Sequence, residues 1–250
     1  MVKEFFKIIL YKPLFNLLAF FAWLVPGHSI GWAIILLTIL VKALLWKLQT
    51  KALMAPLQMR AHQDELKEIQ EKHKDDRAAQ GQAVLAFYKS KGISPFSGCL
   101  PALIQLPVIY ILYRVFIAGL NESRLDLIYP FTPHVETLNT MFFGLDLSKP
   151  EVWILPLIAA VTQFIQSKHY ASLTQPKGPI SKDDTTAMMN KQMIYLFPLM
   201  TFFFARSFPA GLSIYWITST VFQFGQQWYI FKIFKLPAEK VTVTVRNKKK

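Results

Sequence analysis

The chain has 250 residues, 53% of them hydrophobic, and a formal net charge of +13 at pH 7. This apolar share is above that of an ordinary soluble domain. Five segments lack Asp, Glu, Lys and Arg: residues 13–41, 92–113, 152–167, 192–205 and 207–231. A helix that crosses a bilayer needs about 20 mostly apolar residues. A soluble globular enzyme and a disordered chain are therefore excluded as starting hypotheses, and an intrachain disulfide is excluded because Cys99 is the sole cysteine.

The N-terminal segment, residues 1–28, allows two interpretations. Three lysines precede an apolar run that extends from Pro13 to Val25 and ends at Pro26-Gly27. The first interpretation, which we favour, is an amphipathic helix that lies in the outer membrane interface. The second is an uncleaved membrane span that begins inside the cell. In the interfacial helix, the aromatic side chains expected in lipid are Phe5, Phe6, Phe15, Phe20, Phe21 and Trp23.

The apolar segments predict five transmembrane helices. Their expected bounds are residues 29–50, 97–117, 152–169, 192–207 and 210–231. The last two are joined by Ser207-Phe208-Pro209-Ala210-Gly211, where Pro and Gly favour a tight turn. We therefore expect an all-α polytopic membrane protein with a five-helix transmembrane core, in which residues 94–231 contain the second to fifth helices.

The basic residues give these helices a direction. Most Lys and Arg residues lie in three polar segments: residues 51–93, residues 170–191 and the tail 232–250. Among Lys and Arg, the loop 118–150 contains only Arg124 and Lys149. Because cytoplasmic loops carry the excess of Lys and Arg, the three polar segments are predicted to be cytoplasmic and loop 118–150 to face outward. The same rule accounts for most of the net positive charge without a nucleic-acid partner.

The polar segment 51–93 has the pattern of a helical hairpin. Acidic and basic residues mix through residues 64–76 above a thin apolar seam, and residues 74–77 interrupt the pattern before it resumes. This predicts two helices that stand in the cytoplasm. The alternative is a solvated charged face with no further role. The apolar residues of the two halves are Leu57, Leu66, Ile69, Val84, Leu85, Phe87 and Tyr88.

The sequence contains no motif for catalysis, metal binding or cofactor binding. None of the 15 acidic residues lies inside a predicted span, whereas a proton- or sodium-coupled transporter usually needs an intramembrane carboxylate. No two of the 5 histidines have metal-ligand spacing, and the HExxH, GxSxG and Gly-rich phosphate-loop motifs are absent. We therefore predict no enzyme, no cofactor and no metal site, and we interpret Cys99 as a small buried residue.

Polar side chains do occur inside the predicted spans, and Lys42 is the most unusual of them. It lies in the middle of the first span, and helical spacing puts Thr38, Trp46 and Gln49 on the same face. A charged residue at mid-membrane costs about 2.5–3.5 kcal/mol on insertion scales, so such residues usually face a polar interior. The alternative is that Lys42 snorkels toward the cytoplasmic end of the helix.

Three other spans carry polar or amphipathic residues at helical spacing. They are Gln105 in the second span, Gln163, Gln166 and Ser167 in the third, and Trp216, Gln223 and Gln227 in the fifth. Such residues either line a watered cavity or hydrogen-bond between helices, where each bond contributes less than about 2 kcal/mol. Together with Lys42 they favour a wet, positively charged groove.

These features resemble the YidC-type membrane protein insertases, whose relatives serve mitochondria and chloroplasts. Four stretches carry the resemblance: Ile34–Leu48 with its mid-span basic residue, the charged segment Lys51–Lys91, Ser94-Pro95-Phe96-Ser97-Gly98-Cys99-Leu100-Pro101 with Ile104-Gln105-Leu106-Pro107, and Phe208-Pro209-Ala210-Gly211-Leu212-Ser213-Ile214-Tyr215-Trp216. The resemblance covers roughly residues 12–235. It implies five core helices around a groove open to the cytoplasm and to lipid, an interfacial helix before the first span, and a mobile cytoplasmic hairpin.

The resemblance also implies groove residues and partners. Lys42 matches the basic residue that receives hydrophilic parts of an entering substrate, and Gln163 and Trp216 match groove-lining positions. The other predicted groove residues are Thr38, Gln105, Tyr215 and Gln223. The implied partners are nascent membrane proteins, the ribosome, a Sec-type translocon and the lipid bilayer, with no small-molecule substrate. Many bacterial members carry arginine in place of Lys42, and a desolvated lysine, unlike arginine, can lose its proton.

We therefore predict a membrane protein insertase and chaperone in the bacterial plasma (inner) membrane, multi-pass with a cytoplasmic C-terminus. Glu4 and the absence of arginine before Arg60 are atypical of a transit peptide, which favours a bacterium. The alternative functions are a small-solute transporter or channel and a partner-dependent assembly factor for a membrane complex. The basic tail residues either bind ribosomal RNA or lie near anionic lipid. These residues are Arg246, Lys248, Lys249 and Lys250.

Overall fold

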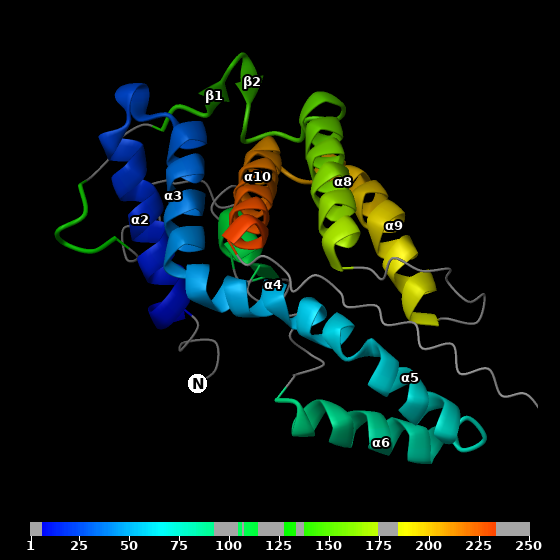
Figure 1. Ribbon diagram of the computed structural model, residues 1–250. Coiled ribbons are helices and arrows are strands. Elements are labelled where there is room, and N and C mark those ends of the chain that lie inside the picture. The colour runs from blue at the N-terminus through cyan, green and yellow to red at the C-terminus, as the bar shows by residue number, and fades with distance from the viewer. Residues whose placement is uncertain are drawn as a thin grey trace, which may run out of the picture.

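The computed structural model describes residues 7–92, 105–106, 108–114, 128–133, 138–174 and 185–233 (Figure 1). This part of the chain is mostly helical, as predicted for an all-α membrane protein. In chain order the elements are η1 (Lys7–Tyr11), α2 (Lys12–Leu24), η2 (Pro26–His28), α3 (Ile30–Leu44), α4 (Trp46–Ala61), α5 (Gln63–Lys72), α6 (Arg77–Ser90), β1 (Met141–Phe142), β2 (Leu145–Asp146), α8 (Ile154–Thr174), α9 (Thr185–Ser207) and α10 (Ala210–Ile233). Residues 105–106 and 108–114 are also helical. Cys99 and the basic tail residues 246–250 lie outside the described residues.

Among the described helices, Lys7–Leu24, formed by η1 and α2, is long and apolar enough to cross a membrane by itself. A second such span exists only if α3 and the first part of α4, as far as Ala55, are taken as one bent helix. Helices α8 and α10 have 21 and 24 residues, but they carry two and three glutamines, which lower their mean hydropathy. Polar residues within long helices therefore distinguish this bundle from a set of simple apolar spans.

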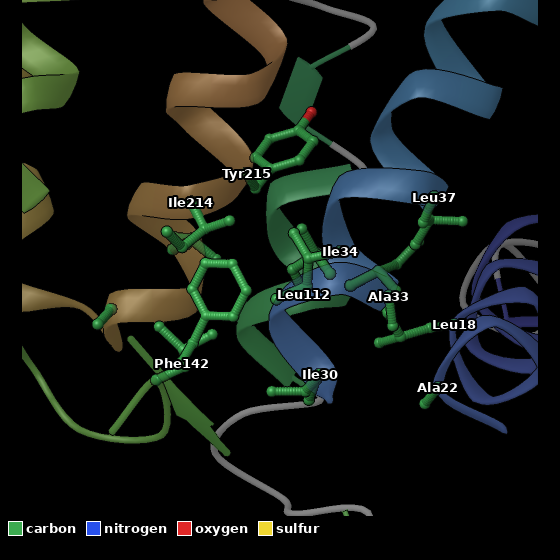
Figure 2. Close-up of a cluster of buried hydrophobic side chains, with 14 of the residues drawn as sticks. Leu18, Ala22, Ile30, Ala33, Ile34, Leu37, Leu112, Phe142, Ile214 and Tyr215 are labelled. Atoms are coloured by element: carbon green, nitrogen blue, oxygen red, sulfur yellow. The ribbon is translucent and has the colours of Figure 1, made fainter. Parts of the chain in front are cut away.

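Helix α2 packs against α3 through one face. Leu18 and Ala22 are buried there, and Figure 2 shows both side chains directed toward α3. Phe20 and Trp23, on another face of α2, are exposed. Phe15 is only 1% exposed, so the prediction that its ring lies in lipid is wrong. The ring instead belongs to the main apolar cluster, because it lies on the face of α2 that meets the neighbouring helices.

Asn16 of α2 forms hydrogen bonds with a segment that is distant in the sequence. Its Oδ1 accepts hydrogen bonds from the backbone N–H of Tyr129 and from the hydroxyl of Thr132, and each bond is 2.7 Å long. Its Nδ2 donates to the carbonyl of Lys12 at 2.7 Å. A buried amide without such partners would cost about 1–3 kcal/mol. These bonds therefore hold residues 128–133 on α2.

The main apolar cluster joins α2, α3, the helical segment 108–114, β1 and the first turns of α10 (Figure 2). Ile34, Leu112 and Leu212 are each at most 1% exposed. Within this cluster, α3 and β1 lie so close together at Gly31 that a side chain at this position would overlap the ring of Phe142. Burial of a large apolar side chain contributes about 1.5–3 kcal/mol, so this cluster fixes one end of the bundle.

We call this end the strand end, because β1 and β2 lie there. The two strands pair antiparallel, with Phe142 opposite Leu145. The chain next to β2 also caps α10: the backbone N–H groups of Ala210 and Gly211 donate to the carbonyls of Lys149 and Leu147. These N–H groups have no partner within their own helix, so the loop satisfies them. The turn between α9 and α10 is thereby tied to the strands.

Glu151 caps α8 at the same end. Its carboxylate accepts hydrogen bonds from the backbone N–H groups of Trp153, Ile154 and Leu155 at 2.9, 3.0 and 2.7 Å. Partial burial raises the pKa of Glu151, but these bonds outweigh the burial and leave that pKa below its usual value. An ionised carboxylate at a helix N-terminus also interacts favourably with the helix dipole.

The first predicted span, residues 29–50, is divided into two helices. Helix α3 ends at Leu44, and α4 begins at Trp46 at an angle of 67° to α3. The prediction that one helical face carries Thr38, Lys42, Trp46 and Gln49 is therefore wrong. Thr38 and Lys42 lie on α3, whereas the other two lie on α4, which points in another direction (Figure 1).

Helices α5 and α6 pack side by side at the far end of α4 (Figure 1). Leu66, Ile69, Val84, Phe87 and Tyr88 form the small apolar cluster between them. The Nζ of Lys91 lies 2.7 Å from the carboxylate of Glu65, and this hydrogen bond lowers the pKa of Glu65 from its usual value. Asp76 caps α6 by accepting hydrogen bonds from the backbone N–H groups of Ala78 and Ala79.

Replacing Gly31 with alanine is expected to destabilise the strand end. The new methyl group would overlap the Phe142 ring, and overpacking a filled core costs about 1–3 kcal/mol. The midpoint of thermal unfolding in detergent should fall, by about 2–4 °C per kcal/mol for a chain of this size. Gly225→Ala in α10 is the matched control, because a methyl group there meets no atom within 4 Å. An unchanged midpoint for Gly31→Ala would contradict the packing against Phe142.

Replacing Asp76 with alanine should loosen the first turn of α6. The change removes the acceptor of two backbone N–H groups, and loss of such a cap typically costs about 1 kcal/mol. Hydrogen–deuterium exchange at Ala78 and Ala79 should therefore accelerate about five-fold. Asp75→Ala is the control, since Asp75 is an exposed neighbouring carboxylate that does not cap the helix. Equal exchange rates in the two variants would show that the Asp76 cap contributes nothing.

Candidate functional site

Three helices, α3, α8 and α10, begin at the strand end and change from apolar to polar along their length (Figure 1). On α3 the buried residues Ile34 and Leu37 precede Thr38 and Lys42. On α10 the buried turn Leu212–Tyr215 precedes Ser219, Thr220 and the glutamines, and on α8 Leu155 and Ala159 precede Gln163. Because α10 packs against both α3 and α8, the polar turns lie toward the same end of the bundle. We call it the α4 end, because α4 begins there.

Lys42 lies on the buried face of α3 and is only 8% exposed. Thr38 precedes it by one helical turn on the same face and is 2% exposed. The hydroxyl of Thr38 donates to the carbonyl of Ile34 at 2.6 Å, so its hydrogen is already used within the helix. In the described part of the chain, no Asp or Glu forms an ion pair with Lys42.

Gln105, Tyr215 and Ser219 meet where the helical segment around residue 105 contacts α10. The Nε2 of Gln105 donates to the hydroxyl of Ser219 over 3.5 Å, and Tyr215 precedes Ser219 by one turn of α10. Figure 2 shows the ring of Tyr215 beside Ile214, with its hydroxyl on the side away from Phe142. Tyr215 therefore marks the boundary between the apolar cluster and the polar turns of α10.

Gln163 is paired with α9. The hydroxyl of Thr201 donates to its Oε1 at 2.6 Å, and both side chains are buried. No hydrogen bond joins Gln163 to Lys42 within the described residues. The predicted groove residues thus fall into separate groups: Gln163 with Thr201, Gln105 with Ser219 and Tyr215, and Lys42 with Thr38.

Trp216 and Gln223 are half-buried on α10. Across the described side chains, neither has a hydrogen bond or ring contact. Gln226, which the predicted set of groove residues does not include, is 1% exposed and bonds to α4. The sequence did contain a signal for it, because the doublet Gln226-Gln227 follows Gln223 at helical spacing.

The arrangement suits binding rather than covalent chemistry. Its polar atoms belong to amides, hydroxyls and one ammonium group, which can hydrogen-bond a polypeptide backbone or attract a carboxylate. Within the ranges that the structure describes, no three His, Cys, Asp or Glu residues lie close enough together to hold a metal ion.

Comparison with known proteins finds relatives over most of the chain. The membrane protein insertase YidC of Nitratidesulfovibrio vulgaris strain DP4 is 36% identical over 222 residues, which cover 88% of this chain and 38% of that protein. The insertases YidC of Syntrophus aciditrophicus and Neisseria gonorrhoeae strain NCCP11945 are 36% and 37% identical. The matched residues cover 82% and 80% of this chain, and 33% and 32% of those proteins.

The chain thus spans about a third of the length of the curated relatives it matches. The family described as 60Kd inner membrane protein matches residues 21–239, which is most of the chain. Because this match and the relatives agree, the chain belongs to the 60Kd inner membrane protein family, which is the family of the YidC membrane protein insertases.

Proposed function

We propose that this chain is a membrane protein insertase that works through its α4 end. The observation that carries the proposal is Lys42, a lysine buried on α3 with no acidic partner among the described residues. A charge within an apolar bundle costs free energy unless it is paired or reached by water. A groove that admits both water and the acidic segments of a substrate meets this requirement.

The energetic problem of an insertase is the polar flank of its substrate. Transfer of an unpaired amide or hydroxyl into an apolar medium costs about 2–7 kcal/mol, and transfer of a charge costs far more. A watered groove lined by Lys42, Thr38, Gln163 and Gln223 shortens the dry distance that the flank must cross. Lys42 attracts acidic residues more strongly than it would in bulk water, because the local dielectric constant is lower.

The apolar segment of the substrate leaves the groove in the other direction. It moves past α8 and α10 into the bilayer, driven by the transfer of apolar surface out of water at roughly 25 cal/mol per Å². Many apolar side chains of α8 are exposed and suit a lipid boundary, among them Leu157, Val161 and Ile165. No step requires a nucleotide or a covalent bond to the substrate.

The proposed transmembrane core consists of α3, the predicted second span, which includes the helical residues 105–106 and 108–114, and helices α8, α9 and α10. In this topology the strand end faces outward, and the α4 end, the hairpin α5–α6 and the C-terminus face the bacterial cytoplasm. The excess of Lys and Arg in residues 51–93 and 232–250 supports this orientation. The apolar cluster of Figure 2 then closes the outer side, while the polar turns of α3 and α10 face the cytoplasm.

The proposed partners follow from this topology. Nascent membrane proteins enter the groove, the ribosome binds the basic tail, and a Sec-type translocon delivers some substrates. The relatives are named membrane protein insertases, and this chain matches only about a third of their length. Insertion by this chain alone is therefore itself part of the proposal.

Purified full-length protein in liposomes should insert a small single-span protein that has an acidic tail. Protease protection of the translocated tail is the measurement. Lys42→Ala should reduce the protected fraction, and Lys42→Glu should reduce it about ten-fold or more, since ~1.4 kcal/mol of repulsion between like charges changes an equilibrium ten-fold. Lys42→Arg keeps the positive charge and should retain most of the activity.

Lys47→Glu is the matched control, because Lys47 is an exposed lysine on α4, five positions after Lys42. Empty liposomes give the background. If Lys42→Glu and the wild type protect the tail equally, Lys42 has no part in the mechanism. Wild-type protection no higher than that of empty liposomes would contradict autonomous insertion and favour a partner-dependent assembly factor.

The basic tail should bind ribosomes through salt-sensitive contacts with RNA phosphates. Changing Arg246, Lys248, Lys249 and Lys250 together to glutamine removes up to four such contacts. The slope of log affinity against log salt concentration should then become shallower by about 3, since each phosphate contact contributes roughly 0.7–0.9. Ribosome pelleting across a salt series measures this slope. An unchanged slope would assign the tail to anionic lipid instead of the ribosome.

A further inference from the structure

The break between α3 and α4 has no local cause in the sequence. Residues 41–50 contain neither proline nor glycine. Sharp helix kinks without these residues usually occur where a side chain or a water molecule inserts into the backbone hydrogen-bond ladder. Because proline and glycine are absent, the contacts that the first turn of α4 makes with the rest of the fold are the next feature to consider for the 67° change of direction.

Gln226 of α10 supplies one such contact. Its Nε2 donates to the backbone carbonyl of Trp46 at 3.1 Å and to the hydroxyl of Thr50 at 3.2 Å. The hydroxyl of Thr50 donates to the same carbonyl at 2.8 Å, so the three groups form a closed ring of hydrogen bonds in the first turn of α4. Because a carbonyl can only accept, it determines that the nitrogen of Gln226 faces α4.

The indole ring of Trp46 is held by the same face of α10. Its centroid lies 5.9 Å from that of Phe222 and 5.9 Å from that of Tyr229, with interplanar angles of 84° and 67°. Residues 222, 226 and 229 follow helical spacing, so they form one surface on α10. Gln226 is 1% exposed, and water therefore cannot easily replace its bonds to α4.

We propose that Gln226 is the positioning residue that fixes the direction of α4 relative to the helices that carry Lys42. In a continuous helix, Trp46 would follow Thr38 and Lys42 on one face. The break turns Trp46 onto α10 instead and leaves Lys42 as the last buried residue of α3. A consequence, which rests on the proposed insertase function, is that the first turns of α4 keep a fixed direction with respect to the groove.

Gln227 provides a comparison within the same turn of α10. It is 0% exposed, and neither polar atom of its amide has a hydrogen-bond partner in the described part of the chain. Two adjacent, fully buried glutamines thus differ in whether they bond to α4. Replacement of each by leucine separates loss of the contact with α4 from loss of a buried amide.

The test measures the direction of α4 by pulsed electron spin resonance on the full chain in liposomes. In a Cys99→Ala background, spin labels are attached at Gln58→Cys, an exposed site on α4, and at Ser172→Cys, an exposed site near the end of α8. With Gln226 present, we expect one narrow distance distribution. Gln226→Leu should shift the equilibrium between α4 directions about ten-fold and add a second distance population, because it removes hydrogen bonds in a buried site.

The control variants make the expected result specific. Gln227→Leu should keep the single distribution, because Gln227 makes no bond to α4. Thr50→Val preserves the shape of the side chain but removes the hydroxyl that accepts from Gln226, so it should broaden the distribution, whereas Thr50→Ser should restore it. Thr50→Val also tests the contact from the α4 side if Gln226→Leu fails to fold.

Two outcomes would overturn the inference. One is a single, unchanged distance distribution in both Gln226→Leu and Thr50→Val, and the other is a broad distribution in the protein with Gln226 intact. Tail protection measured on unlabelled protein separates this inference from the proposed function. Failure of wild-type insertion contradicts the function alone, whereas unchanged distances contradict the role of Gln226 alone.

Discussion

Polar side chains buried between largely apolar helices are the constraint on which this structure depends. Each such group must find a partner or water, since an unpaired one costs free energy. The protein pairs most of them internally: Gln163 with Thr201, Gln105 with Ser219, and Gln226 with the backbone of α4. Lys42 is the charged exception, because no acidic residue pairs with it in the described part of the chain. In the proposed function, water and the acidic segments of a substrate satisfy Lys42.

The apolar cluster at the strand end separates this end of the bundle from the buried polar side chains. Phe142 packs against Gly31, and the loop next to β2 caps the first turn of α10, so the helices are held tightly at that end. Close packing leaves no room there for water or for a polar segment. The polar turns of α3 and α10 lie toward the α4 end, away from this packing. In the insertase function proposed above, water and substrate reach these turns from the α4 end.

The sequence predicts those features that depend on residues close together in the chain. The composition predicted a mostly helical chain, and helical spacing placed Thr38 and Lys42 on one face of α3, where both side chains are buried. Features that depend on distant partners could not be predicted in this way. The break before Trp46 depends on Gln226, 180 positions along the chain, and the partner of Gln163 depends on how α9 aligns with α8. The burial of Phe15 could not be predicted either, because only the packing of α2 decides which aromatic rings face lipid.

The bond that Gln226 makes to α4 differs in kind from the other polar pairs. Its main acceptor is the backbone carbonyl of Trp46, which would be present whatever side chain stood at that position. Substitutions along α4 can therefore change its exposed surface without removing the bond that sets its direction. The indole ring adds packing against Phe222 and Tyr229, but the hydrogen bond depends on residue 226. In this proposal the direction of the first turns of α4 is thus encoded mainly in α10, the helix that also carries the predicted groove residues Trp216 and Gln223.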